Sequence, residues 1–142
     1  MKLKRITIDI IPHNMQDYDT VGNYKIYEDI IAITVSDMGN WMFNVLVAFH
    51  ELIEVILIIK AGIKNSDITA FDAKFEADRI KGLHGPTEEP GNDLKAPYRS
   101  QHVFATMIER LLAKAFKVKW EKYDKAVWSF EYKKDKGSYG GI

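Results

Sequence analysis

The chain contains no cysteine, which excludes disulfide bonds and thiolate metal ligands. Any bound metal ion must therefore be held by His, Asp or Glu side chains. Neither sign of charge is in excess, because 20 basic residues balance 20 acidic ones. No overall field then draws the chain to nucleic acid or to an anionic membrane. The lack of cysteine fits a reducing compartment, and we expect a cytoplasmic protein.

Several common sequence signals are also missing. The basic residues near Met1 are followed by a segment that Asp9 interrupts, so no export signal is expected. No uninterrupted apolar run, including residues 55–59, is long enough to span a bilayer. The sequence has no Gly-rich phosphate loop and no serine nucleophile elbow. We therefore predict no membrane partner and find no strong signal for nucleic-acid binding.

Length and composition indicate one globular domain. The 142 residues are 46% apolar and 28% charged, which is ordinary for a protein with a single core. We expect this domain to span residues 1–132. Residues 133–142 are rich in Lys and Gly, and we predict a disordered tail there.

Apolar residues alternate with polar ones in the first part of the chain. Ile6, Ile8 and Ile10 predict a half-buried strand that Pro12 ends. Residues 24–27 and 31–35 predict two further strands. We expect a small antiparallel sheet of two or three strands, and therefore an α+β fold in which the sheet packs on helices.

Four helices are predicted after residue 40. They cover residues 40–61, ending at Gly62, 66–80, 98–116 and a shorter segment near 120–128. The third helix has an expected core face of Val103, Met107 or Ile108, Leu111, Leu112 and Phe116. Residues 82–97 are rich in Gly, Pro and acidic residues and predict a long irregular loop. Four of its side chains either contribute to a site or are simply solvated: His84, Glu88, Glu89 and Asp93.

Three ionisable residues interrupt the first predicted helix. Residues 45–59 are apolar except for His50, Glu51 and Glu54, so we expect this helix to be buried. The three side chains project from one side of the helix. A buried carboxylate is costly unless it takes up a proton, pairs with a cation or binds a metal. The segment therefore predicts half of a metal site; the alternative is a Glu paired with Arg or Lys and a His that bonds a backbone carbonyl.

The remaining ligand is expected from the third helix. His102 is our candidate, and its alternative is a histidine near the helix start that is exposed or bonded to an amide. Glu109, two turns further along, either orients a ligand imidazole or pairs with Arg110 or a lysine. Asp72 and Glu76 on the second helix either add carboxylates to the site or form a solvated pair.

The segment VAFHELIE, residues 47–54, follows a strand that ends ITVSD at residues 33–37. It resembles the active-site helix of zincin-type metallopeptidases. The resemblance implies a zinc-dependent hydrolase of peptides, in which His50 binds zinc, Glu51 is the general base and His102 is a later ligand. The sequence departs from the family's His-Glu-x-x-His motif because Glu54 stands in place of the second His.

Two further resemblances give alternatives. The whole chain is similar to small proteins of phage and prophage genomes, a similarity that implies no activity. Glu51 and Glu54 also match part of the carboxylate motif of the all-α nucleotide pyrophosphohydrolases, which bind Mg²⁺. There the second motif would be Asp72 and Glu76, four residues apart where the family has three. We predict a metal-binding protein, with zinc the expected ion and Mg²⁺ or Mn²⁺ the alternatives. The predicted activity is hydrolysis of an unknown, peptide-like substrate, and a non-catalytic metal-stabilised protein is the other possibility.

Overall fold

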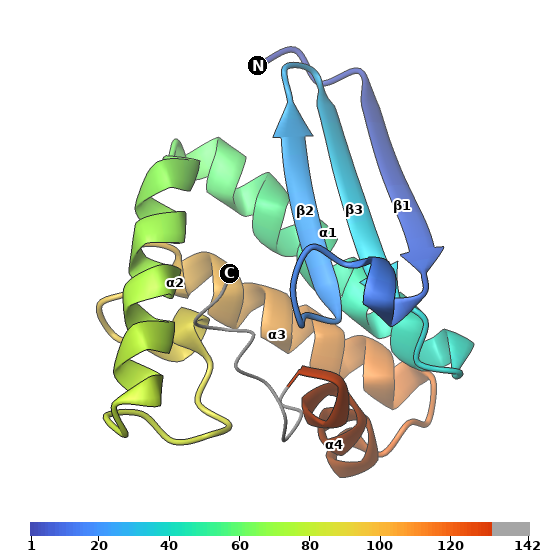
Figure 1. Ribbon diagram of the computed structural model, residues 1–142. Coiled ribbons are helices and arrows are strands. Elements are labelled where there is room, and N and C mark those ends of the chain that lie inside the picture. The colour runs from blue at the N-terminus through green and yellow to red at the C-terminus, as the bar shows by residue number, and fades with distance from the viewer. Residues whose placement is uncertain (132–142) are drawn as a thin grey trace.

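A computed structural model describes residues 1–131 as a sheet packed on a layer of helices (Figure 1). The predicted tail of residues 133–142 lies outside these residues. The elements are β1 (Arg5–Ile11), η1 (His13–Met15), β2 (Gly22–Tyr27), β3 (Ile30–Ser36), α1 (Trp41–Ala61), α2 (Asn65–Ile80), η2 (Pro90–Asn92), α3 (Arg99–Ala115) and α4 (Trp120–Glu131). The predicted α+β fold is thus confirmed.

The sheet has three strands in the order β1-β3-β2. β2 and β3 form an antiparallel hairpin, but β1 lies parallel to β3, with Ile8 opposite Ile33. The prediction of a purely antiparallel sheet was therefore wrong. The alternation of apolar and polar residues is the same in both kinds of pairing, so it could not reveal the direction of β1. Ile31, Ile33 and Val35 of the central strand are fully buried against the helices.

α1 lies behind the sheet and packs against β2, β3 and α3 (Figure 1). Its first turn is capped by the Asn40 side chain, which accepts two backbone N–H groups, and it ends at Gly62 in the left-handed conformation. By length and composition α1 alone, among residues 1–131, is apolar enough to cross a membrane. In the fold it is a core helix that is only partly buried, because Phe49 and Ile56 are exposed. The prediction of a fully buried helix was wrong on this side.

α3 is turned with its polar side inward. His102, Ala105, Glu109 and Ala113 are buried, whereas Phe104, Met107 and Leu111 are 46%, 55% and 62% exposed. Leu111, and Met107 as the alternative to Ile108, had been predicted as core residues, and the prediction was wrong for these two. Leu112 and Phe116, predicted with them, do pack against the core. The two exposed residues were misassigned because the prediction gave the core to the most apolar stripe, while the fold buries the stripe that carries the ionisable groups.

Residues 81–98 connect α2 to α3 and include the short turn η2. Arg79 at the end of α2 donates hydrogen bonds to the backbone carbonyls of Gly85 and Glu88, and its guanidinium pairs with Glu76 at 2.8 Å. His84 stacks on Phe75, with ring centroids 3.7 Å apart. These contacts hold the loop against α2, so that its second half lies near α3.

Candidate metal centre

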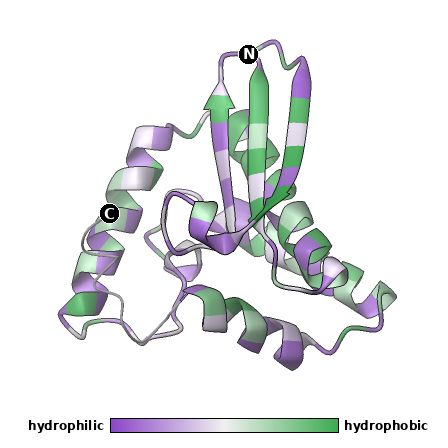
Figure 2. Cartoon of the chain, turned by 45° about the vertical axis from the view of Figure 1, so that its right-hand side comes forward, coloured by the Kyte–Doolittle hydropathy of each residue, from purple (hydrophilic) through white to green (hydrophobic). Residues whose placement is uncertain are grey.

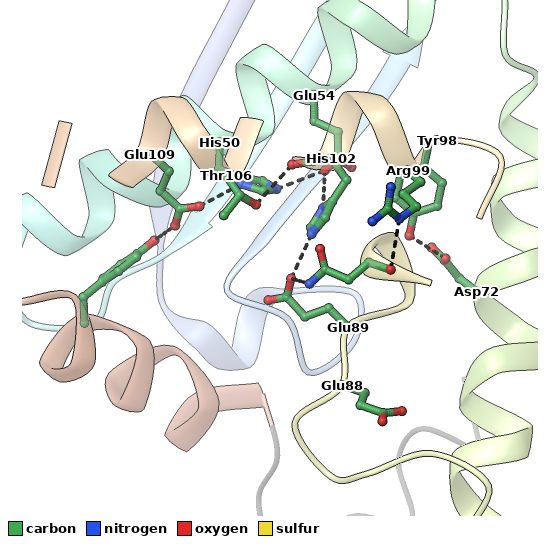
Figure 3. Close-up of polar contacts among 12 residues, drawn as sticks. His50, Glu54, Asp72, Glu88, Glu89, Tyr98, Arg99, His102, Thr106 and Glu109 are labelled. Carbon is green, nitrogen blue, oxygen red and sulfur yellow. Dashed lines mark hydrogen bonds and ion pairs between the residues drawn. The ribbon is translucent and has the colours of Figure 1, made fainter. Parts of the chain in front are cut away.

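His50, Glu54 and His102 converge between α1 and α3 (Figure 3). Glu54 Oε2 lies 3.0 Å from His50 Nε2 and 2.8 Å from His102 Nδ1. One ligand atom from each residue lies within 4.8 Å of the other two, so the three side chains could hold a metal ion. The sequence prediction placed the same three residues together, and the structure brings them to one point.

The far nitrogen of each imidazole also faces a carboxylate. His50 Nδ1 lies 2.8 Å from Glu109 Oε1, and His102 Nε2 lies 2.8 Å from Glu89 Oε2. Tyr123 of α4 donates a hydrogen bond to the other oxygen of Glu109. Carboxylates commonly hold metal-binding histidines in this way, because the bond fixes both the ring orientation and the tautomer. Of the two interpretations of Glu109, the structure supports the one in which it orients an imidazole.

The backbone explains why these side chains meet. His50 and Glu54 are one turn apart on α1, and α3 runs antiparallel beside it, so His50 faces Glu109 while Glu54 faces His102. The turn η2 covers the site from the loop. Its Gly91 is buried against the His102 ring, where an added Cβ would lie only 2.4 Å from the ring atom Cγ. Glycine is required there for this close approach.

The electrostatics of the cluster follow from burial and pairing. Burial alone would lower the pKa of His50 and His102, but hydrogen bonds to Glu109, Glu54 and Glu89 outweigh it. The pKa of His102 rises to about 9, and that of His50 lies well above its ordinary value. Burial opposes ionisation of Glu54, yet hydrogen bonds from both imidazoles lower its pKa to about 2. Without a metal, two imidazolium ions therefore share three carboxylates.

The donor set fits a divalent transition metal. Two imidazole nitrogens and one carboxylate oxygen are ligands that zinc accepts in catalytic sites with an open position. Both imidazoles must be neutral to bind an ion, so a divalent cation would replace two protons. The net charge of the cluster is then the same with two extra protons as with one divalent ion. The exchange is therefore electrostatically feasible at a buried position.

Glu51 lies beside this cluster but does not bond to it. Its side chain is packed under Gly22 of β2, whose added Cβ would lie 2.7 Å from Glu51 Cγ and Oε1. Burial and the charge of Glu54 raise the pKa of Glu51 to about 8. No hydrogen bond holds its carboxylate within residues 1–131. The structure thus provides a carboxylate that can exchange a proton near neutral pH next to the three candidate ligands.

A cleft of about 950 Å³ opens onto the cluster between α1, α2, α3 and α4. Its lining includes the three candidate ligands and Glu51. Asp72 and Glu76 also line the cleft, but they are not members of the cluster. Asp72 accepts a hydrogen bond from Tyr98 at 2.7 Å and has a pKa raised to about 6 by burial, while Glu76 pairs with Arg79.

A second polar cluster joins the sheet to η1. His13 Nδ1 lies 2.8 Å from Ser36 Oγ and His13 Nε2 lies 3.2 Å from Asp19 Oδ1, which are the residue types of a serine hydrolase triad with the two ring nitrogens exchanged. Ser36 is fully buried, however, and its hydroxyl donates to the carbonyl of Thr20. No substrate can reach this serine, so the cluster serves to fix η1 on the sheet.

Sequence reasoning missed the specific roles of Glu89, Gly91 and Tyr123. Glu89 had been considered only as one charge among several in a loop, whereas it bonds His102. Tyr123 gave no signal, because its contact with Glu109 joins two helices.

Comparison of the chain with protein-family models, with curated proteins and with solved structures gives no match. The assignment of a function therefore depends on the geometry of the site.

Proposed function

We propose that this chain is a zinc-dependent hydrolase that binds its ion through His50, Glu54 and His102. The observation that carries the proposal is the convergence of three ligand atoms within 4.8 Å, with both far imidazole nitrogens held by carboxylates. A histidine that served only to fill the core needs one hydrogen-bond acceptor and not two. Two such residues around one carboxylate are better explained by an ion than by packing.

Glu51 is proposed as the general base. When bound, zinc acts as a Lewis acid that increases the acidity of water and polarises a carbonyl group. A base is most effective when its pKa lies near the working pH, and the pKa of Glu51 is raised to about 8. The unbonded carboxylate of Glu51 faces the same cleft as the ligands and can accept the proton there. Hydrolysis of an amide or ester bond is the reaction that this set of groups favours.

A peptide-like substrate agrees with the lining of the cleft. Glu51, Glu89 and Asp124 are among the several carboxylates that line it, whereas Arg110 is its only Lys or Arg among residues 1–131. Arg110 is itself stacked on Trp120 at 4.3 Å. A polyanionic substrate is disfavoured in such a field unless it brings its own cations. A neutral or basic peptide is not disfavoured by these carboxylates.

Metal analysis and one substitution test the proposal. Protein purified without an affinity tag should contain about one zinc ion per chain. Glu51→Gln should keep the zinc and lose turnover of a library of fluorescence-quenched peptides. His102→Ala should lose the zinc, and Glu121→Gln, a matched change at an exposed site on α4, should alter neither. A wild-type chain that neither carries zinc nor takes it up would refute the proposal.

A second candidate is hydrolysis of nucleoside triphosphates with Mg²⁺. The observation that favours it is that Glu51, Glu54, Asp72 and Glu76 line one cleft from two helices. In this case pyrophosphate would be released from a nucleotide panel in the presence of Mg²⁺, and Asp72→Asn would abolish the release. Under the zinc proposal, the same substitution leaves metal content unchanged.

A non-catalytic role for the metal is the third candidate. Bound zinc would then raise the melting temperature of the chain, Glu51→Gln would keep the zinc, and neither protein would hydrolyse any peptide of the library. Loss of peptide hydrolysis in this variant would exclude that role.

A further inference from the structure

The outer edge of β1 is open among residues 1–131, because β1 pairs only with β3. Arg5 N donates to the carbonyl of Asp29, and the carbonyl of Ile11 accepts from Asp37 N. In a parallel pair, alternate residues face the neighbouring strand, so the odd-numbered residues of β1 make the ladder with β3. The N–H and C=O groups of Ile6, Ile8 and Ile10 therefore point outward from the free edge.

The side chains of the same three isoleucines form an uncovered apolar strip. They stand opposite Ile31, Ile33 and Val35, so they lie on the helix-facing side of the sheet. Those partners are 0% exposed, whereas Ile6, Ile8 and Ile10 are 40%, 43% and 47% exposed. The reason is the position of α1, which packs against β3 and β2 and leaves β1 uncovered. Figure 2 shows the alternation of hydrophobic and hydrophilic residues along this edge strand.

The strip continues onto α1. Gly22 of β2 contacts Val47 and Glu51, which fixes the side of α1 that lies under β2. At 100° per residue, the opposite flank of the sheet-facing surface carries Leu52 and Ile56 and so turns toward β1. Ile56, and Phe49 next to it, are exposed. An open backbone edge and an apolar surface thus adjoin each other, a combination that monomeric proteins usually avoid.

We propose that β1 pairs antiparallel with β1 of a second copy of this chain, which gives a two-fold dimer with a continuous six-stranded sheet. The outward groups belong to even-numbered residues, so hydrogen-bonded pairs must join even residues of the two copies. In the register centred on Thr7, Ile6 bonds with Ile8 of the second copy. Arg5 then lies opposite Asp9 of the second copy, twice by symmetry.

Charge complementarity favours this register, and it favours a second copy of the chain as the partner. Arg5, Thr7 and Asp9 alternate with the isoleucines and are therefore on the polar face of the sheet, where Arg5 and Asp9 are exposed. Shifting the register by one bonded pair, so that Ile8 meets Ile8, puts Thr7 opposite Asp9 and Arg5 opposite Ile11. Only the register centred on Thr7 pairs the opposite charges across the two-fold axis. The same strip on both copies is the requirement for an isologous interface.

Light scattering coupled to size-exclusion chromatography tests the dimer with the full chain. The wild-type protein should have twice its 16.3 kDa chain mass at micromolar concentration. Ile8→Lys places a charge in the strip and should give the monomer mass. Leu111→Lys makes the same kind of change on the exposed stripe of α3, opposite to the side that faces α1, and should leave the dimer intact. A wild-type monomer, or a dimer that Leu111→Lys dissociates and Ile8→Lys does not, overturns the proposal.

A charge exchange tests the register. Arg5→Glu alone and Asp9→Arg alone each place like charges opposite each other twice, and each should weaken the dimer about ten-fold. The double substitution restores opposite charges and should recover wild-type affinity in sedimentation equilibrium. Both positions are exposed, so the melting temperature of each variant should verify that the fold is unchanged. Failure of the double variant to recover would refute the register, and sedimentation of a wild-type monomer with lipid vesicles would assign the strip to a membrane instead.

Discussion

Gly91 offers a way to disturb the metal centre without touching any ligand. A Cβ at this position would lie 2.4 Å from Cγ, 2.7 Å from Nδ1 and 2.8 Å from Cδ2 of His102. Ordinary van der Waals contact begins near 3.4 Å, so in Gly91→Ala the imidazole or the turn η2 must move by about 1 Å. The ring is held at both nitrogens, and a shift of this size breaks its alignment with Glu54 or with Glu89.

The expected loss of zinc affinity in Gly91→Ala is about 10- to 100-fold, the effect usual for removal of a group that orients a ligand. Overpacking should also destabilise the metal-free chain by about 1–3 kcal/mol. A competition titration against a chromophoric chelator gives the affinity, and urea unfolding gives the stability.

The matched control for this substitution is Gly85→Ala, in the same loop, whose added Cβ meets Glu88 at 3.6 Å in ordinary contact. Neither glycine has a positive φ, so alanine introduces no backbone strain at either position. Unchanged zinc affinity in Gly91→Ala, or an equal loss in both variants, would show that the His102 position does not set the affinity.

Three other predictions concern the support of the site, its protons and the helix that carries it. Glu109→Gln should weaken zinc binding about 10- to 100-fold and Tyr123→Phe by less, since the tyrosine acts on His50 only through Glu109; the chelator titration should show this order, and a reversed order would contradict it. Zinc uptake at pH 7 should release close to two protons, because His50 and His102 have raised pKa values in the metal-free chain, and the affinity should increase with pH up to about 9. Calorimetry in buffers of different ionisation enthalpy should detect the released protons, and a zinc affinity independent of pH between 6 and 9 would contradict the prediction. The same raised pKa values stabilise the metal-free fold below pH 6.5, and this stabilisation is lost as the pH rises through about 9. Asn40→Ala should reduce the free energy of unfolding by about 1 kcal/mol, because two backbone N–H groups lose their acceptor; urea unfolding measures it, and no loss would mean that water replaces the cap.

Local signals in the sequence were enough to place most of the elements. The alternation of Ile6, Ile8 and Ile10 gave β1, and Gly62 ended α1 at the observed residue. The cap of α1 is Asn40, the residue at which the first helix was expected to begin. Such features depend on residues that are close together in the chain, so they can be recognised in a single sequence.

Half of the candidate site was predictable for the same reason. His50 and Glu54 are one turn apart in an apolar helix, and this spacing alone places them on one side. His102 was found because it and Glu109, two turns further along, lie on one side of the third predicted helix. Glu89 and Gly91 were not predictable as parts of the site, because their contacts with His102 depend on the path of a loop that Arg79 anchors from another helix.

The orientation of α3 links the metal centre to the exposed surface of the molecule. His102 and Glu109 lie on the side of the helix opposite to Phe104, Met107 and Leu111, so burial of the first pair forces the second group into solvent. Full burial of such side chains is worth roughly 1.5–3 kcal/mol each, and leaving them about half exposed forgoes on the order of 3 kcal/mol in all. A helix selected only for stability would rotate to bury its apolar stripe. This loss of stability is explained if the buried imidazole and carboxylate have a function, since stability is commonly sacrificed at functional sites.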